Sequence, residues 1–289
     1  MKQLNIFIEL TRLKKPIGYM LLFWPCVWGL TIAYDFSMNI QIFIKYALLF
    51  FSGAILMRSA GCIINDIVDK DLDAKVERTK NRPIASGKVS IKLGLFYVFI
   101  LCGLALIVLI QFNLFTIILA LCSMPLAFTY PLMKRFTYWP QLFLGVTFNY
   151  GLILGWTSIN SEISIVPMIF YLGAIFWTLG YDTIYGFQDI KDDEIIGVKS
   201  TSIKFKKNPK FFILICYLIF IVILTYLGIL MNFNKIYFGG LLLITMHLFI
   251  FQIKNLIVDL ETNCLKIFKS NNFLGLLIFL NILIGKIIA

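Results

Sequence analysis

Two clusters of aspartates are the residues in this sequence best suited to chemistry. In the first, Asp66, Asp69 and Asp73 follow at intervals of three and four residues, so on a helix they share one face, whereas Asp71 points elsewhere. The second cluster repeats this kind of spacing, with the members Asp182, Tyr185 or Gly186, Asp189 and Asp193. If the two helices face each other, the two rows of carboxylates converge.

Closely spaced carboxylates repel one another, and the repulsion grows where water is scarce. A divalent cation offsets it, and Mg²⁺ typically takes one or two carboxylates while water and substrate phosphates fill its other positions. We therefore expect Mg²⁺ as the cofactor and a diphosphate as its substrate group. A solvated acidic helix end is an equal explanation for one cluster, but two clusters at the ends of apolar segments favour function.

Cationic side chains accompany both clusters and could neutralise phosphate oxygens. Arg78 and Arg82 follow the first cluster, and Lys199 follows the second. Arg58 lies two helical turns before Asp66 inside an apolar segment, so we expect it to face a bundle interior, where it either pairs with a carboxylate such as Asp66 or binds a substrate anion. The other candidates for contacting an anion or orienting a ligand are Arg12, Asn65, Lys134 and Arg135.

Membrane-spanning helices must position these residues. The chain is 60% apolar, more than a soluble domain carries, and a spanning helix needs about 20 mostly apolar residues. Nine segments satisfy this criterion, near 17–34, 41–64, 92–110, 114–131, 141–158, 164–186, 211–231, 236–253 and 272–288. The sequence therefore predicts an all-α polytopic membrane protein, a bundle of nine transmembrane helices, with one membrane-embedded domain over residues 1–289.

The charge pattern predicts the orientation of these spans. Most of the 26 Lys and Arg residues lie before the first segment or after even-numbered segments, and such residues prefer cytoplasmic loops. We therefore expect a cytoplasmic N-terminus and both aspartate clusters at the cytoplasmic face. The same pattern explains the net charge of +11 without nucleic acid. The six scattered cysteines and the single histidine, His247, argue against a metal site built from those residue types.

These motifs resemble those of the intramembrane aromatic prenyltransferase family, and most closely its 4-hydroxybenzoate polyprenyltransferases. The first family signature, Asn-Asp-x-x-Asp-x-x-x-Asp, matches residues 65–73, and Arg82-Pro83 follows it. The second matches Tyr181-Asp182-Thr183-x-Tyr185, Asp189, Asp193 and Lys199-Ser200-Thr201. Between them, Tyr130-Pro131 and Pro140-Gln141 are also similar, so the resemblance covers nearly the whole chain.

The resemblance implies a nine-helix bundle whose active site opens toward the inner face, with a lateral opening to lipid for a long prenyl tail. It implies transfer of a polyprenyl group from its diphosphate to the carbon ortho to the hydroxyl of 4-hydroxybenzoate, in ubiquinone biosynthesis. The expected location is the bacterial inner membrane, with the active site facing the cytoplasm. The expected partners are these two substrates and membrane lipid, with no nucleic acid and no obligate protein partner.

The roles that we expect follow from this reaction. Arg58 is the first candidate for the acceptor's carboxylate, and Asp182 or Tyr185 could take the ring proton or steady the phenol, a task that released diphosphate could also perform. The candidate ligands of Mg²⁺, directly or through water, are Asp66, Asp69, Asp73, Asp189 and Asp193. The rival functions are prenyl transfer to a naphthoate, homogentisate or haem and, outside enzymes, transport, although transporter sites usually lie near the bilayer midplane.

Overall fold

The structure is a computed structural model that describes residues 2–287. Within this range every regular element is a helix. Met1 and residues 288–289, which include the end of the ninth predicted span, lie outside the described residues.

All nine predicted spans correspond to helical segments. In the described part of the chain, eight of them are long and apolar enough to cross a membrane. The remaining one, the first span, is α2 (Ile17–Ala33), which is apolar but has 17 residues. The eight are α3 (Ile40–Val68), α5 (Ile91–Leu109), the broken segment α6 (Leu114–Cys122), α7 (Met124–Thr129), η1 (Tyr130–Leu132) and α8 (Met133–Phe136), α9 (Pro140–Asn160), α10 (Ile165–Gly186), α13 (Pro209–Leu230), α14 (Lys235–Met246) with η2 (His247–Lys254), and α15 (Glu261–Ile287).

Short polar side chains mark where five of these helices begin. In each case an Asn or Ser side chain accepts a hydrogen bond from a backbone N–H in the first turn, which satisfies a group that would otherwise lack a partner. These capping residues are Asn39, Ser90, Asn113, Ser164 and Asn234. The polar caps fix the helix starts that hydropathy alone places only approximately.

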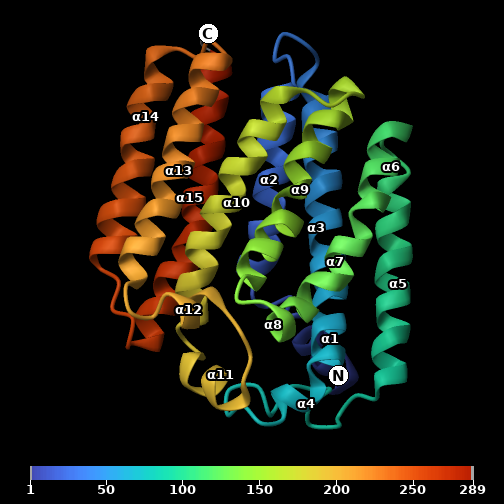
Figure 1. Cartoon of the computed structure of the whole chain (residues 1–289). Helices are drawn as coiled ribbons and strands as arrows, with labels where there is room; N and C mark the ends of the chain where they lie inside the picture. The colour runs from blue at the N-terminus through green and yellow to red at the C-terminus, as the bar shows by residue number, and fades with distance from the viewer. Residues whose placement is uncertain (1, 288–289) are drawn as a thin grey trace.

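Helices α2 and α9 pack at the centre of the bundle, where small residues allow their backbones to approach. A methyl group at Gly29 would overlap the Leu152 carbonyl, with Leu152 Cα only 3.0 Å away, and one at Gly155 would overlap the Cys26 carbonyl. Trp28 is fully buried beside this contact and stacks on Phe170 with ring centroids 5.5 Å apart. Figure 1 shows α13, α14 and α15 on one side of this centre and α5 and α6 on the other.

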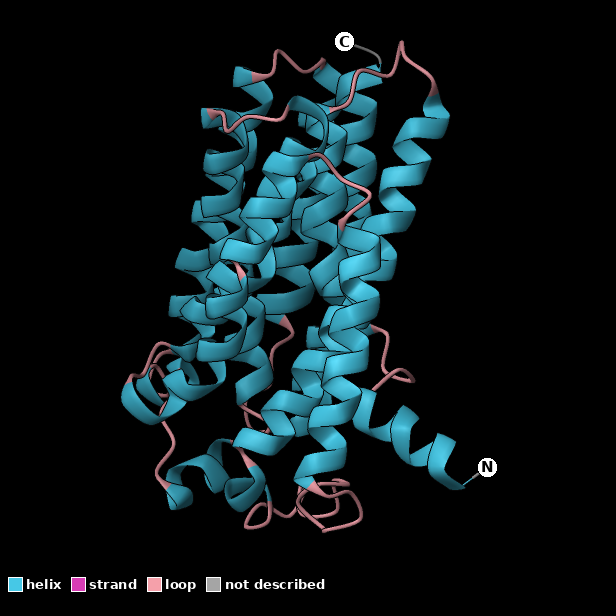
Figure 2. Ribbon diagram, turned by 90° about the vertical axis from the view of Figure 1, so that its right-hand side faces the viewer, coloured by secondary structure: helices cyan, strands magenta, loops and turns pink. Residues whose placement is uncertain are grey.

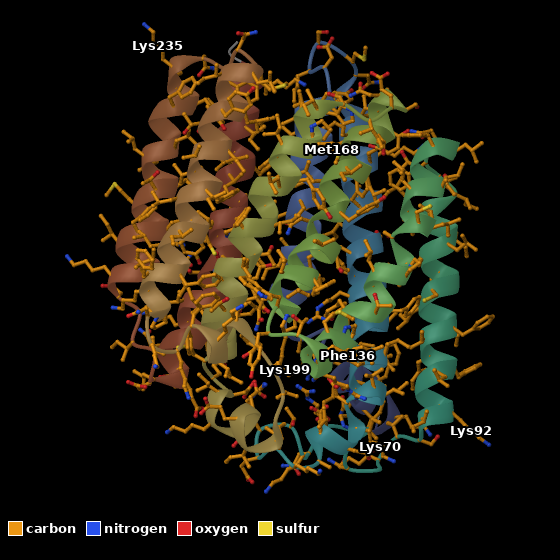
Figure 3. The ribbon with its side chains drawn as sticks, in the orientation of Figure 1. Lys70, Lys92, Phe136, Met168, Lys199 and Lys235 are labelled. Carbon is orange, nitrogen blue, oxygen red and sulfur yellow. The ribbon has the colours of Figure 1, made fainter. Side chains whose placement is uncertain are left out.

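The remaining short helices gather at one end of the bundle. They are α1 (Lys2–Thr11), α4 (Lys70–Asp73), α11 (Ile190–Ile196) and α12 (Thr201–Lys204), and Figure 1 places all four, with α8, at the lower end. Helix α1 projects sideways from that end in Figure 2. Lys70 and Lys199 lie there too, whereas Lys235 lies at the opposite end (Figure 3). Both aspartate clusters are therefore at the same end of the bundle.

Candidate functional site

The first aspartate cluster continues the path of α3 beyond its last turn. The Asp69 N–H donates to the Asn65 carbonyl at 2.9 Å and the Asp73 N–H to the Asp69 carbonyl at 2.7 Å, so the chain stays close to helical. Asp66, Asp69 and Asp73 are 2%, 1% and 7% exposed, whereas Asp71 is exposed. Three carboxylates thus share a buried face, as their spacing predicts.

The second cluster faces the first across a polar cavity of about 250 Å³. Asp182 belongs to the last turns of α10, Asp189 precedes α11, and Asp193 lies within α11. The predicted site residues that line the cavity are Asn65, Asp69, Asp73, Arg78, Arg82, Lys134, Asp182, Tyr185, Asp189, Asp193 and Lys199. The convergence of the two clusters is therefore a feature of the fold. Four predicted residues are not among its lining: Arg12, Arg58, Asp66 and Arg135.

Ion pairs tie the two halves of this site together. Arg78, in the loop after α4, donates from Nε and Nη2 to the two oxygens of Asp189 at 2.6 and 2.5 Å. Lys134, on α8, donates to Asp69 Oδ2 at 2.5 Å. The Lys199 N–H donates to the Lys134 carbonyl at 2.8 Å, which joins α8 to the segment after α11. Arg78 and Lys134, which were predicted to contact an anion, therefore also neutralise aspartates of the site.

Asp66 is held by cations behind the cavity. Arg12 Nη2 lies 2.5 Å and Arg82 Nη1 3.3 Å from Asp66 Oδ1, and the same Arg82 atom lies 2.7 Å from Asp73 Oδ2. Arg12 itself adopts a left-handed backbone conformation with φ 56°. Asp66 thus does not line the cavity itself, and it is paired with cations, as are Asp69 and Asp73, which do line it. Its role as a metal ligand stays a prediction.

Asp69 retains an oxygen suited to a cation. Its Oδ1 is buried and has no hydrogen-bond partner, and the nearest cation on that side, Arg135 Nη2, is 3.8 Å away and donates instead to the Val68 carbonyl. Buried polar atoms are rarely left unsatisfied. Among residues 2–287 no group of three acidic, His or Cys side chains surrounds a metal position by itself. These residues fit Mg²⁺ only if water and phosphate oxygens complete its coordination, as the sequence indicated.

The raised pKa values of Asp69 and Asp193 also fit a cation site. Burial, together with the neighbouring Asp189, raises the pKa of Asp193 to about 7. Burial likewise raises the pKa of Asp69, although Lys134 opposes the shift. A cation placed between such groups favours their charged forms.

Arg58 lines a second, apolar cavity of about 370 Å³. Its Nε is buried without a hydrogen-bond partner, and its Cζ lies 5.5 Å from the centre of the Phe148 ring. Asp66, the carboxylate named as its partner, is instead paired with Arg12 and Arg82. Contact with a substrate anion stays a prediction, as does pairing with another carboxylate of the site.

Tyr130 and Gln141 line the polar cavity but were not predicted as site residues. Tyr130 lines both cavities and so marks their junction. Gln141 Oε1 accepts from the Thr201 N–H at 3.0 Å and thereby holds the segment after the second cluster. The sequence indicated these two residues only through the short motifs between the clusters, Tyr130-Pro131 and Pro140-Gln141.

Arg82 makes a testable contribution to stability because it is shared by two buried carboxylates. We expect Arg82→Met to lower the free energy of unfolding by on the order of 3 kcal/mol, since Asp66 and Asp73 lose a partner. Lys80→Met is the matched control, because Lys80 pairs only with the exposed Glu77 and its loss costs less than about 1 kcal/mol. Equilibrium unfolding in mixed micelles measures both, and equal losses would contradict the shared role.

Known proteins resemble this chain along almost its entire length. The profile of the UbiA prenyltransferase family matches residues 22–281. The mitochondrial 4-hydroxybenzoate polyprenyltransferase of Drosophila pseudoobscura pseudoobscura is 41% identical over 98% of this chain and 70% of that protein. The 4-hydroxybenzoate octaprenyltransferase of Psychromonas ingrahamii is 39% identical over 96% of each chain.

A solved structure shares the fold at low sequence identity. A UbiA homolog from Archaeoglobus fulgidus bound to GPP and Mg²⁺ superposes with a TM-score of 0.73 and 16% identity, over 97% of this chain and 99% of that one. The helical architecture is therefore that of the UbiA fold. Given the match of the family profile and the full-length relatives, this chain belongs to the UbiA prenyltransferase family.

Proposed function

We propose that this chain is a Mg²⁺-dependent 4-hydroxybenzoate polyprenyltransferase of ubiquinone biosynthesis, which transfers a polyprenyl group to the ring carbon ortho to the hydroxyl. The observation that carries the proposal is the joining of both aspartate clusters around one polar cavity, beside an apolar cavity lined by Arg58. Relatives bearing this name match over almost the whole chain.

The carboxylates that face the polar cavity are suited to holding Mg²⁺ and the diphosphate. Asp69, Asp73, Asp189 and Asp193 would bind the ion directly or through water. When bound, the ion supplies positive charge that stabilises the departing diphosphate. Asp66, which does not line the cavity, would act through water, and its pairing with Arg12 and Arg82 also positions those cations.

Cations around the same cavity would bind the phosphate oxygens. Arg78, Arg82, Lys134 and Lys199 all line it, and charge-assisted hydrogen bonds to phosphate are among the stronger ones in proteins. As the C–O bond to the allylic carbon breaks, negative charge grows on the diphosphate, and these donors stabilise it.

Arg58 is suited to the carboxylate of the acceptor. Its buried Nε has no hydrogen-bond partner, and Arg58 lines the apolar cavity together with Tyr130, which also lines the polar one. An aromatic ring bound there could reach the first carbon of the prenyl group. Asp182 and Tyr185 line the polar side and could accept the ring proton or hold the phenol, unless released diphosphate takes the proton. The Tyr185 ring is held by Phe268, with ring centroids 4.4 Å apart.

The apolar cavity is suited to the beginning of the prenyl tail. Its walls come from α2, α3, α5, α6, α7 and α9. Leu106 on α5 and Leu121 on α6 line it and are each 50% exposed, so we propose that a tail longer than the cavity passes between these two helices into lipid.

The same proposal includes the chain's setting. We place the protein as one membrane-embedded domain, residues 1–289, in a bacterial inner membrane with the N-terminus and the active site facing the cytoplasm. The gathering of Lys70, Lys92 and Lys199 at the lower end supports this orientation (Figure 3).

The orientation can be tested by labelling single introduced cysteines. In intact cells, a membrane-impermeant maleimide should label Lys235→Cys, whereas Lys70→Cys should react only after the inner membrane is opened. The reverse pattern would invert the topology. The unmodified protein, with its six native cysteines, gives the background.

The reaction can be tested by acceptor competition. Membranes containing the protein, Mg²⁺ and a polyprenyl diphosphate receive equal amounts of 4-hydroxybenzoate, 1,4-dihydroxy-2-naphthoate and homogentisate, and products are resolved by mass. We expect prenylated hydroxybenzoate alone, and none after chelation of Mg²⁺. A different prenylated acceptor would keep the chemistry but refute the acceptor, and no product from folded protein would favour the transport alternative.

The metal assignment can be tested with three substitutions of similar size. We expect Asp69→Asn and Asp189→Asn each to lower the initial rate at saturating substrates by at least about 10²-fold, because each removes a charge facing the diphosphate site. Asp71→Asn, an exposed position in the same cluster, should leave the rate unchanged. Substantial activity in both cavity variants would refute the assignment.

A further inference from the structure

Gly18 lies in the first turn of α2, directly against the side chain of Arg58. A methyl group at residue 18 would lie 2.8 Å from Arg58 Nε and 3.5 Å from both Cζ and Nη2. Real side chains are essentially never found as close as the first of these distances. The guanidinium therefore occupies space that exists because residue 18 has no side chain.

Phe148, on α9, also contacts Arg58. Its ring is buried, and its centre lies 5.5 Å from Arg58 Cζ, within the range of a cation–π contact. Nε has no hydrogen-bond partner, and Asp66, the carboxylate named as a partner for Arg58, is paired with Arg12 and Arg82. Contacts with α2 and α9 therefore place the guanidinium.

We propose that Gly18 is a positioning residue for Arg58 and thereby determines the affinity for the acceptor's carboxylate. The inference rests on the proposed role of Arg58 as the group that binds this carboxylate. A guanidinium recognises a carboxylate through two parallel hydrogen bonds, so a displacement on the order of 1 Å costs much of the interaction.

The structure indicates that an alanine at residue 18 would move the arginine and leave the helix in place. The nearest atoms belong to the end of a flexible side chain, in contrast to Gly29 and Gly155, where a methyl group would meet backbone. Alanine is also a better helix former than glycine. Folding should therefore survive the substitution while Arg58 shifts.

The test is steady-state kinetics of Gly18→Ala in membranes, with the wild type and Gly103→Ala for comparison. Gly103 is exposed on α5, and a methyl group there meets nothing within 4 Å. We expect the KM for 4-hydroxybenzoate to rise about tenfold in Gly18→Ala, with the KM for the polyprenyl diphosphate and the melting temperature unchanged. Gly103→Ala should match the wild type in all three.

A double-mutant cycle with Arg58→Ala separates positioning from a general effect of the helix. Alanine lacks the whole guanidinium that residue 18 would crowd, so Gly18→Ala should add little to Arg58→Ala, and the two effects should not be additive. Additive effects, an equal rise in KM for both substrates, or a lowered melting temperature would each overturn the inference. If the wild type is active and Gly18→Ala has the same KM for 4-hydroxybenzoate, the inference fails and the proposed function stands. If the wild type is inactive on 4-hydroxybenzoate, both the proposed function and this inference are refuted.

Discussion

Aspartates buried at one end of a helix bundle require positive partners, because an unpaired charge in such surroundings is strongly unfavourable. In this chain the partners come from separate segments: Arg12 from the turn before α2, Arg82 from the loop before α5, and Lys134 from α8. Each ion pair joins one of these segments to the first aspartate cluster. The site is therefore assembled by the same charges that it presents to a ligand.

This pairing also determines which ligands the site can accept. Mg²⁺ alone would compete with cations for the carboxylates, and a diphosphate alone would compete with carboxylates for cations such as Arg78 and Lys134. A ligand that brings both gives each set of charges a new partner at once. Asp69 Oδ1 is buried without a hydrogen-bond partner, so a cation could approach it without displacing one.

Features encoded locally could be predicted from the sequence, and features set by packing could not. The shared face of Asp66, Asp69 and Asp73 follows from helical periodicity, and the helical segments follow from runs of apolar residues. The pairing of Arg12 with Asp66 joins residues 54 apart, and that of Arg78 with Asp189 joins residues 111 apart. Such pairs depend on how the helices cross, which hydropathy does not specify. For the same reason the sequence left the partner of Arg58 open.

The spacing of α2 and α9 connects the core of the bundle to the proposed acceptor site. Gly29 and Gly155 bring the two backbones together. Gly18 on α2 and Phe148 on α9 both lie against the Arg58 side chain. Because these two helices are joined by close backbone contacts, the packing of the core also places the neighbours of Arg58. Helix packing thus positions Arg58, whose Nε has no hydrogen-bond partner.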